Sequence, residues 1–211
     1  MIRILFYLIV FLTSQMGLMA QNTAYDKGMQ KAFGLWQEGK PAEASQLFER
    51  IAAAESQNWI PAYYVSYMNT MYAFQEKDFE KLSLTLKKAQ QYLDNANAVS
   101  ANNPELLVLQ ALIHTAWIAY DGQTYGMKLS GATAALHQKA MAMAPNNPRV
   151  VLCNAEWEMG AAKFFGKDTA PYCKDIAKAY NLFANFKTET PFYPSWGQKR
   201  AQQLLNNCQA K

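Results

Sequence analysis

Prolines that precede apolar helical segments recur at a near-constant interval along this chain. They are Pro61, Pro104, Pro148 and Pro194, separated by 43, 44 and 46 residues, and two of them stand in the matching words Asn-Asn-Pro-Glu and Asn-Asn-Pro-Arg. Proline favours the first turn of a helix, and a fixed period in this range is typical of stacked helix pairs. The sequence therefore predicts an all-α solenoid with a helix start near each proline.

Residues 1–20 predict a secretory signal peptide. Arg3 precedes an apolar run over residues 4–12, and Ala20 is a small residue suited to the position before cleavage. We expect residues 21–211 to form one helical repeat domain that is exported to the periplasm or the cell envelope. Gln21 is not a cysteine, so the usual bacterial lipid anchor is not expected. The alternative is an uncleaved anchor, although the apolar run is shorter than the about 20 residues that span a bilayer.

The charge of the chain argues against a nucleic-acid partner. The formal net charge is +4, and removal of Arg3 with the signal leaves +3. The basic residues are dispersed, and the densest pairs, Lys87-Lys88 and Lys199-Arg200, fall where solvated helix faces are expected. A nucleic-acid footprint needs a stronger and more clustered positive charge.

The mature chain is expected to form about four helix pairs and a C-terminal capping helix. Apolar residues at helical spacing indicate the helices, and glycine and proline residues between them indicate where each helix ends. In the third pair we expect a glycine-rich insertion, with Gly122, Gly126 and Gly131, before the second helix. The expected helices cover residues 24–37 and from 41 onward, 58–74 and 78–95, 104–120 and 132–144, 148–165 and 172–186, and finally 195–208.

The segment with Gly39, Pro41, Ala44 and Phe48 resembles the turn and second helix of tetratricopeptide repeats. The resemblance implies a right-handed superhelix of antiparallel helix pairs. The run over residues 191–197, with the words around Pro148 and Gly166, also resembles a group of exported bacterial tetratricopeptide-like proteins of unknown function. That second resemblance brings no assigned chemistry.

In tetratricopeptide proteins the first helix of each pair lines a concave groove, and the resemblance implies candidate groove residues here. Val108, Leu112 and Leu152 stand where some members carry the polar groups that clamp a peptide carboxylate, so a groove ligand should be mixed apolar and polar. The projected residues are Phe33, Trp36, Val65, Asn69, Tyr72, Val108, Leu112, Thr115, Arg149, Leu152 and Glu156.

Cysteines and aromatic residues give two further expectations. Of Cys153, Cys173 and Cys208, the last two lie near helix ends that antiparallel packing would bring together, which favours a Cys173–Cys208 disulfide and a buried Cys153. The aromatic residues of the helix over residues 58–74 surround it almost completely. They favour core packing, with some tyrosine hydroxyls in a groove as the alternative.

No catalytic or metal-binding constellation stands out. The two histidines, His114 and His137, lie on different helices, and Glu156 is one carboxylate on a helix face, so we expect no enzyme, no metal and no cofactor. The leading hypothesis is an exported, non-catalytic protein-interaction or envelope assembly module with unidentified protein partners. The alternative is a peptide, glycan or small-molecule binding protein that uses the aromatic concave groove.

Overall fold

The structure is a computed structural model that describes residues 24–188 and 190–209. The expected signal peptide lies outside the described residues. Helices account for most of the described chain, and no β-strand occurs in these two ranges. No helix in the described part is both long and apolar enough to span a bilayer.

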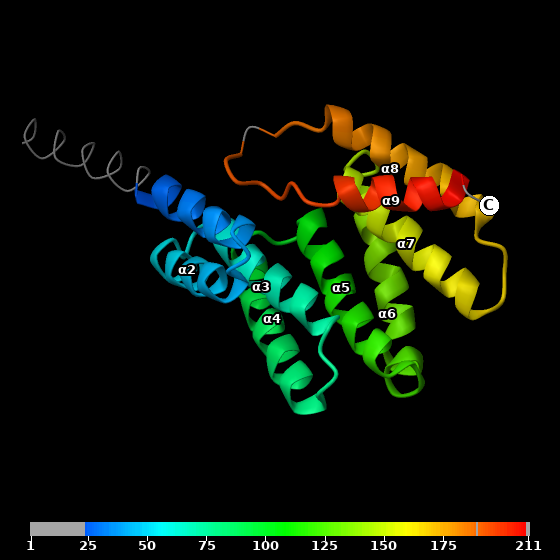
Figure 1. The fold of residues 1–211 in the computed structure, drawn as a ribbon, viewed down its shortest axis with the longest axis horizontal. Coiled ribbons are helices and arrows are strands. Elements are labelled where there is room, and N and C mark those ends of the chain that lie inside the picture. Colours follow the sequence, from blue (N-terminus) through cyan, green and yellow to red (C-terminus); the bar gives the residue numbers. More distant parts are fainter. Residues whose placement is uncertain (1–23, 189, 210–211) are drawn as a thin grey trace, which may run out of the picture.

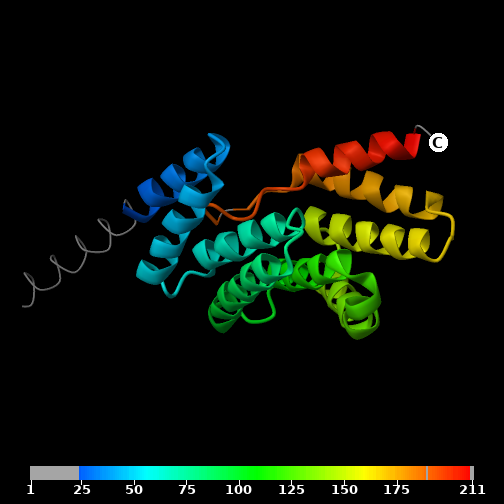
Figure 2. The same cartoon turned by 60° about the horizontal axis from the view of Figure 1, so that its bottom comes forward.

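The helices pack as antiparallel pairs that follow one another along the chain, as Figures 1 and 2 show. The predicted all-α solenoid is therefore confirmed. The pairs are the helix over residues 24–37 with α2 (Pro41–Ala54), α3 (Trp59–Ala73) with α4 (Phe79–Val99), α5 (Pro104–Tyr120) with α6 (Gly122–Met143), and α7 (Pro148–Phe164) with α8 (Cys173–Asn185). A short 3-10 helix, η1 (Ala170–Tyr172), precedes α8, and α9 (Gln198–Gln209) packs on α8 as the cap.

Asparagine caps explain why the first helices of the last three pairs begin where they do. The side-chain oxygens of Asn58, Asn103 and Asn147 accept hydrogen bonds from backbone N–H groups two residues later, at 2.9 to 3.0 Å. Pro104 and Pro148 then occupy the first helical positions, where the missing N–H of proline is harmless.

The expected glycine-rich insertion in the third pair is wrong. Helix α6 begins at Gly122, because the side chain of Asp121 caps it by accepting a hydrogen bond from Thr124 N at 3.0 Å. Gly126 and Gly131 are helical residues with open space where a Cβ would lie. Glycine inside a helix costs about 1 kcal/mol relative to alanine, which tertiary packing overrides here.

Pro194 is not a helix start. It is buried in an irregular segment, described over residues 186–188 and 190–197, which we call the strap, and α9 begins only at Gln198. The strap leaves the end of α8, runs across to the first two pairs and returns to α9 (Figures 1 and 2). The final helix is thus shorter at its start than the expected 195–208.

Small residues and aromatic rings share the core. Ala89, Ala140 and Ala179, one on each of three second helices, are completely buried and allow close helix approach. On α3, Tyr63, Tyr64 and Tyr67 are buried, which confirms their expected core role. Tyr72 and Phe74, at the end of the same helix, are instead exposed.

Candidate functional site

The strap covers the aromatic surface that the first helices would otherwise present. The Phe192 ring centroid lies 6.0 Å from that of Phe33 and 5.6 Å from that of Tyr25. Trp196 stacks on Tyr67 with 4.8 Å between ring centroids, and its Nε1 donates a hydrogen bond to the Tyr63 hydroxyl at 2.7 Å. This part of the expected groove therefore holds a segment of the same chain.

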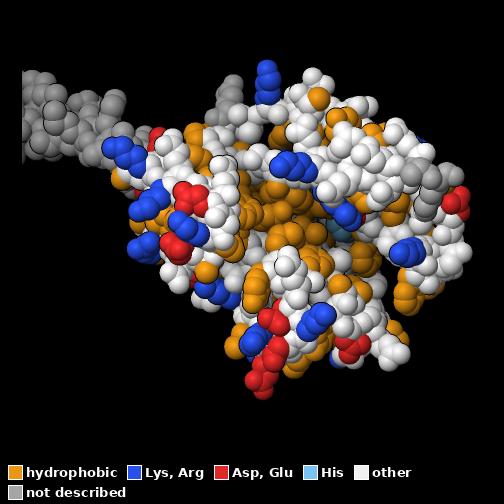
Figure 3. All heavy atoms as spheres, in the orientation of Figure 1, with side chains coloured by type: hydrophobic (Ala, Val, Ile, Leu, Met, Phe, Trp, Pro, Cys, Tyr) orange, Lys and Arg blue, Asp and Glu red, His pale blue; other side chains and the backbone are white. Residues whose placement is uncertain are grey.

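The expected groove residues do not line one continuous groove. Phe33 and Trp36 are half-buried in the aromatic cluster that the strap joins, and Leu112 is half-buried against the core. Tyr72 is 57% exposed at the far end of α3. Asn69 is half-buried, and its side-chain amide donates to Val65 O at 2.8 Å. An apolar hollow does lie near the middle of the face seen in Figure 3.

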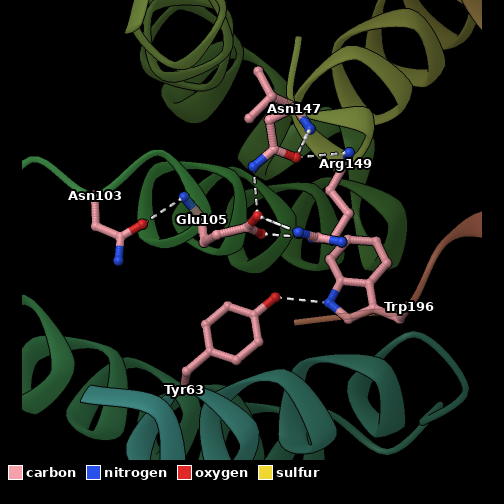
Figure 4. Close-up of polar contacts among 7 residues, drawn as sticks. Tyr63, Asn103, Glu105, Asn147, Arg149 and Trp196 are labelled. Carbon is pink, nitrogen blue, oxygen red and sulfur yellow. Dashed lines mark hydrogen bonds and ion pairs between the residues drawn. The ribbon is translucent and has the colours of Figure 1, made fainter. Parts of the chain in front are cut away.

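Arg149 lies in the interior and makes the central ion pair of the molecule, drawn in Figure 4. Its Nη2 is 2.6 Å from Glu105 Oε1, and its Nε donates to Glu105 Oε2 at 2.9 Å. Asn147 Nδ2 donates to the same carboxylate at 2.6 Å. The guanidinium also lies 5.0 Å from the Phe186 ring centroid and 5.5 Å from that of Tyr193. Arg149 is thus a structural residue that ties the strap to α5 and α7.

Glu156 lies at a different place, in an open cleft of about 690 Å³ between the second half of α7, the loop before η1, and α9. Its carboxylate accepts a hydrogen bond from Arg200 Nε at 2.7 Å. The cleft is lined by Glu156, Met159, Gly160, Lys163, Gly166, Lys167, Asp168, Thr169, Cys173, Arg200, Leu204, Asn207 and Cys208.

The cleft combines unpaired positive charge with apolar and glycine surface. Lys163 and Lys167 form no ion pair within the described ranges. The carboxylate of Asp168 accepts a hydrogen bond from Ala170 N at 2.9 Å, which gives it a local partner. A Cβ added at Gly160 or Gly166 would meet no atom within 4 Å, so this part of the wall is open.

The Cys173–Cys208 disulfide forms part of the same cleft. It joins the start of α8 to the end of α9, as the antiparallel arrangement of the two helices requires, with 5.9 Å between the Cα atoms. Cys153 is a free, buried thiol, and burial raises its pKa well above the ordinary value. It is therefore not a reactive thiolate at neutral pH.

The two histidines occupy separate environments in the third pair. His114 Nδ1 lies 3.4 Å from the hydroxyl of buried Thr133. His137 is buried against Trp157, with 6.0 Å between ring centroids, and its Nδ1 has no hydrogen-bond partner in the described part of the chain. The described residues contain no group of three or more His, Cys, Asp or Glu side chains arranged to hold a metal ion.

A second cleft, of about 480 Å³, lies between α2 and α4 near the start of α3. Its wall includes Glu49, which pairs with Lys88 at 2.6 Å. Among the described residues, no lysine or arginine lines this cleft. Its charge pattern therefore provides less to orient an ionic ligand than the cleft beside α9.

Two features of the structure, the Glu105–Arg149 ion pair and the path of the strap, were not predicted from the sequence. The Glu105–Arg149 pair had a signal, because the matching Asn-Asn-Pro words are followed by residues of opposite charge. The path of the strap had only the weak signal of Pro191 and Pro194 among aromatic residues. Neither pattern indicates which distant helices such a segment contacts.

Neither a protein-family model nor a curated protein sequence matches this chain. Among solved structures, it is similar to the HusA haemophore from Porphyromonas gingivalis, with 23% identity and a TM-score of 0.78 over 90% of this chain and 95% of that one. A thermophilic TPR protein of Thermus thermophilus matches at 13% identity and a TM-score of 0.43, over 89% of this chain and 100% of that one. The likeness to the haemophore shows that the two chains share a helical fold over nearly their whole lengths.

Proposed function

We propose that this protein is an exported, non-catalytic binding protein that carries an amphipathic organic anion in the cleft beside α9. The observation that carries the proposal is the cleft itself, in which Lys163 and Lys167, without an ion pair among the described residues, stand next to apolar and glycine surface. Its volume of about 690 Å³ lies within the usual range for small-molecule sites. A ligand with an apolar body and one or two carboxylates would fit this distribution of charge.

Porphyrins are the ligand class to test first. They combine a flat apolar ring with carboxylates, which matches the apolar wall formed by Met159 and Leu204 and the positive charge of the two lysines. The HusA structure, which shares the fold, is described as that of a haemophore. That description supports the choice of probe, while the proposal for this chain depends on its own cleft.

Binding without catalysis agrees with the titratable groups of the cleft. Glu156 is paired with Arg200, and Asp168 caps the backbone at Ala170. Each carboxylate therefore has a local structural partner, and the free thiol of Cys153 is buried elsewhere. A general base or nucleophile would need a group that is free to react with a bound ligand.

The test is a titration of the purified mature protein with haem and with metal-free protoporphyrin, followed by absorbance and tryptophan fluorescence. Lys163→Gln/Lys167→Gln should weaken binding of both probes by about tenfold, equivalent to roughly 1.4 kcal/mol. The matched control is Lys81→Gln/Lys87→Gln, which removes two exposed lysines from α4. The metal-free probe separates recognition of the ring and carboxylates from iron coordination.

Two outcomes would contradict the proposal. The protein would fail as a porphyrin carrier if neither probe bound. If both bound and the lysine variant behaved like the control, the site would not be this cleft, and the apolar hollow of Figure 3 would be the next place to examine.

A protein-interaction or envelope assembly role is the second candidate. It is favoured by large apolar side chains exposed near the turns within the helix pairs, such as Tyr72 at 57% and Phe79 at 50%. Crosslinking of the mature protein in its native envelope, followed by mass spectrometry, tests this candidate. One dominant protein partner crosslinked through these turns would favour it, whereas recovery of the protein alone would argue against it.

A further inference from the structure

Two adjacent phenylalanines project from the end of α7. Phe164 is 80% exposed and Phe165 is 68% exposed, and their ring centroids lie 5.1 Å apart. Lys163 precedes them and Lys167 follows after one glycine, and both lysines are exposed. Single exposed apolar side chains are normal on a protein surface, whereas adjacent large ones that form a patch are typical of an interaction site.

The phenylalanine tip belongs to one edge of the molecule. The turns within the second, third and fourth helix pairs lie along this edge, the lower and right-hand edge in Figure 1, which we call the turn edge. The neighbouring turn between α5 and α6 exposes Tyr120 at 37% and Met127 at 92%. Lys128 lies beside them, over the ring of Tyr125. Two successive turns thus present exposed apolar side chains together with lysine.

We propose that the phenylalanine tip of the turn edge docks on the surface of an anionic lipid bilayer. Phe164 and Phe165 enter the interface between headgroups and acyl chains, and Lys163 and Lys167 lie at the level of the lipid phosphates. Aromatic and long apolar side chains combined with lysines are the residues that bind such interfaces. The charge beside the rings is complementary, because residues 163–168 carry two lysines and one carboxylate, that of Asp168, and so have a net positive charge.

The area of the tip favours lipid over a protein partner. Each aromatic side chain buries about 150–250 Å², so the pair provides roughly half of the about 800 Å² that each partner contributes to a stable protein interface. A bilayer needs no matching surface, because its apolar layer accommodates protruding apolar side chains of any shape. Two protruding rings flanked by cations therefore fit a lipid surface better than a second folded protein.

Docking would bring the mouth of the cleft to the membrane. Lys163, Gly166 and Lys167 flank the phenylalanine pair and also line the cleft beside α9. An amphipathic ligand would then pass between the bilayer and the cleft without crossing open water. This transfer step depends on the proposed function, whereas the docking does not.

The experiment is a flotation assay of the purified mature protein with vesicles of phosphatidylcholine alone and of phosphatidylcholine mixed with phosphatidylglycerol. We expect the protein to float with the anionic vesicles and less with the neutral ones. Phe164→Ser/Phe165→Ser should weaken vesicle binding by at least about tenfold, because the rings that leave water on docking are removed. The matched control is Val99→Ser/Met143→Ser, which removes two exposed apolar side chains from the opposite ends of the second helices.

The outcomes separate this proposal from the proposed function. Absence of flotation, or equal flotation of the phenylalanine variant and the wild type, would overturn bilayer docking. A loss of dimers in light scattering of the variant, without any vesicle binding by the wild type, would assign the tip to contact between copies of the chain. Porphyrin binding in solution should survive Phe164→Ser/Phe165→Ser, so a failed porphyrin titration with intact flotation would contradict only the proposed function.

Discussion

At the scale of single residues, Glu105 and Arg149 concentrate most of the buried charge of the described chain. Their side chains are 0% and 1% exposed, and each follows an Asn-Pro helix start on a neighbouring first helix. Removing the charges of Glu105 and Arg149 from water is costly. The hydrogen bonds that Asn147 and Arg149 donate to Glu105 offset this cost, but only while both charged side chains are present. The pair therefore fixes the relative position of α5 and α7 more than it adds net stability.

Removal of one partner should be strongly destabilising. Glu105→Leu leaves the Arg149 guanidinium buried without its counter-charge, and we expect the free energy of unfolding in urea to fall by about 3–5 kcal/mol. The half-buried control Lys88→Gln, which breaks the pair with Glu49, should cost only about 1 kcal/mol. The double variant Glu105→Leu/Arg149→Met should recover part of the loss. A cost no greater than that of the control would contradict the structural role of the pair.

His137 predicts a pH dependence of stability. Burial lowers its pKa from 6.5 to about 4. Between these pH values His137 therefore binds a proton in the unfolded chain but not in the folded one. The contribution of His137 to the free energy of unfolding is fully present above pH 6.5 and is lost as the pH falls toward 4. The contribution is up to about 3 kcal/mol. In His137→Phe, urea unfolding at a series of pH values should show a shallower decrease than in the wild type. Equal slopes would show that His137 does not titrate in this way.

At the scale of elements, the sequence predicted the helices well where caps and periodicity agree. Helix α4 begins beside the expected residue 78, where Asp78 caps it, and α5 and α7 begin at Pro104 and Pro148 as expected. The predictions failed where glycine and proline were interpreted without tertiary context. The glycines of residues 122–131 predict an insertion, yet helix packing and the Asp121 cap keep them in α6. The proline interval predicts a helix start at Pro194, yet this residue is buried in the strap. The cleft beside α9 was not predictable, because it depends on how three elements meet.

The disulfide should hold α9 against the last pair. Apart from Cys208, α9 is held by the buried Ala201, by the half-buried Leu204 and Leu205, and by the hydrogen bond from Arg200 to Glu156. Cys173→Ser/Cys208→Ser should lower the free energy of unfolding by about 2–4 kcal/mol. Amide hydrogen exchange should accelerate first in α9. Cys153→Ala should leave exchange in α9 unchanged, and an equal change in both variants would contradict a specific role of the disulfide.

At the scale of the whole molecule, the strap turns an open stack of helix pairs into a closed one. Figure 2 shows it crossing from the last pair to the first two pairs. Gly197 ends it at a φ of +109°, where a Cβ would lie 2.6 Å from the Phe183 side chain, so the return to α9 requires glycine. An open solenoid relies on contacts between neighbouring repeats alone, whereas here the first and last pairs are also joined directly.

Loss of the strap contacts should release the first pairs from the last pair. Trp196→Ala removes the stacking on Tyr67 and should lower the free energy of unfolding by about 3 kcal/mol. This value is near the lower end of the range for buried aromatic residues, because Trp196 is only half-buried. Trp196→Phe keeps a ring there but leaves the Tyr63 hydroxyl without the indole donor, which should cost about 1–3 kcal/mol.

Hydrogen exchange distinguishes closure by the strap from a general loss of stability. In Trp196→Ala, amides of the helix over residues 24–37 and of α3 should exchange faster, because the strap packs Phe192 on the former and Trp196 on the latter. Amides of α8 should keep their protection, since the disulfide and α9 still cover that helix. Uniform acceleration along the chain would instead show that the whole stack unfolds as one unit. The strap would then contribute to a single core without closing the solenoid as a separate element.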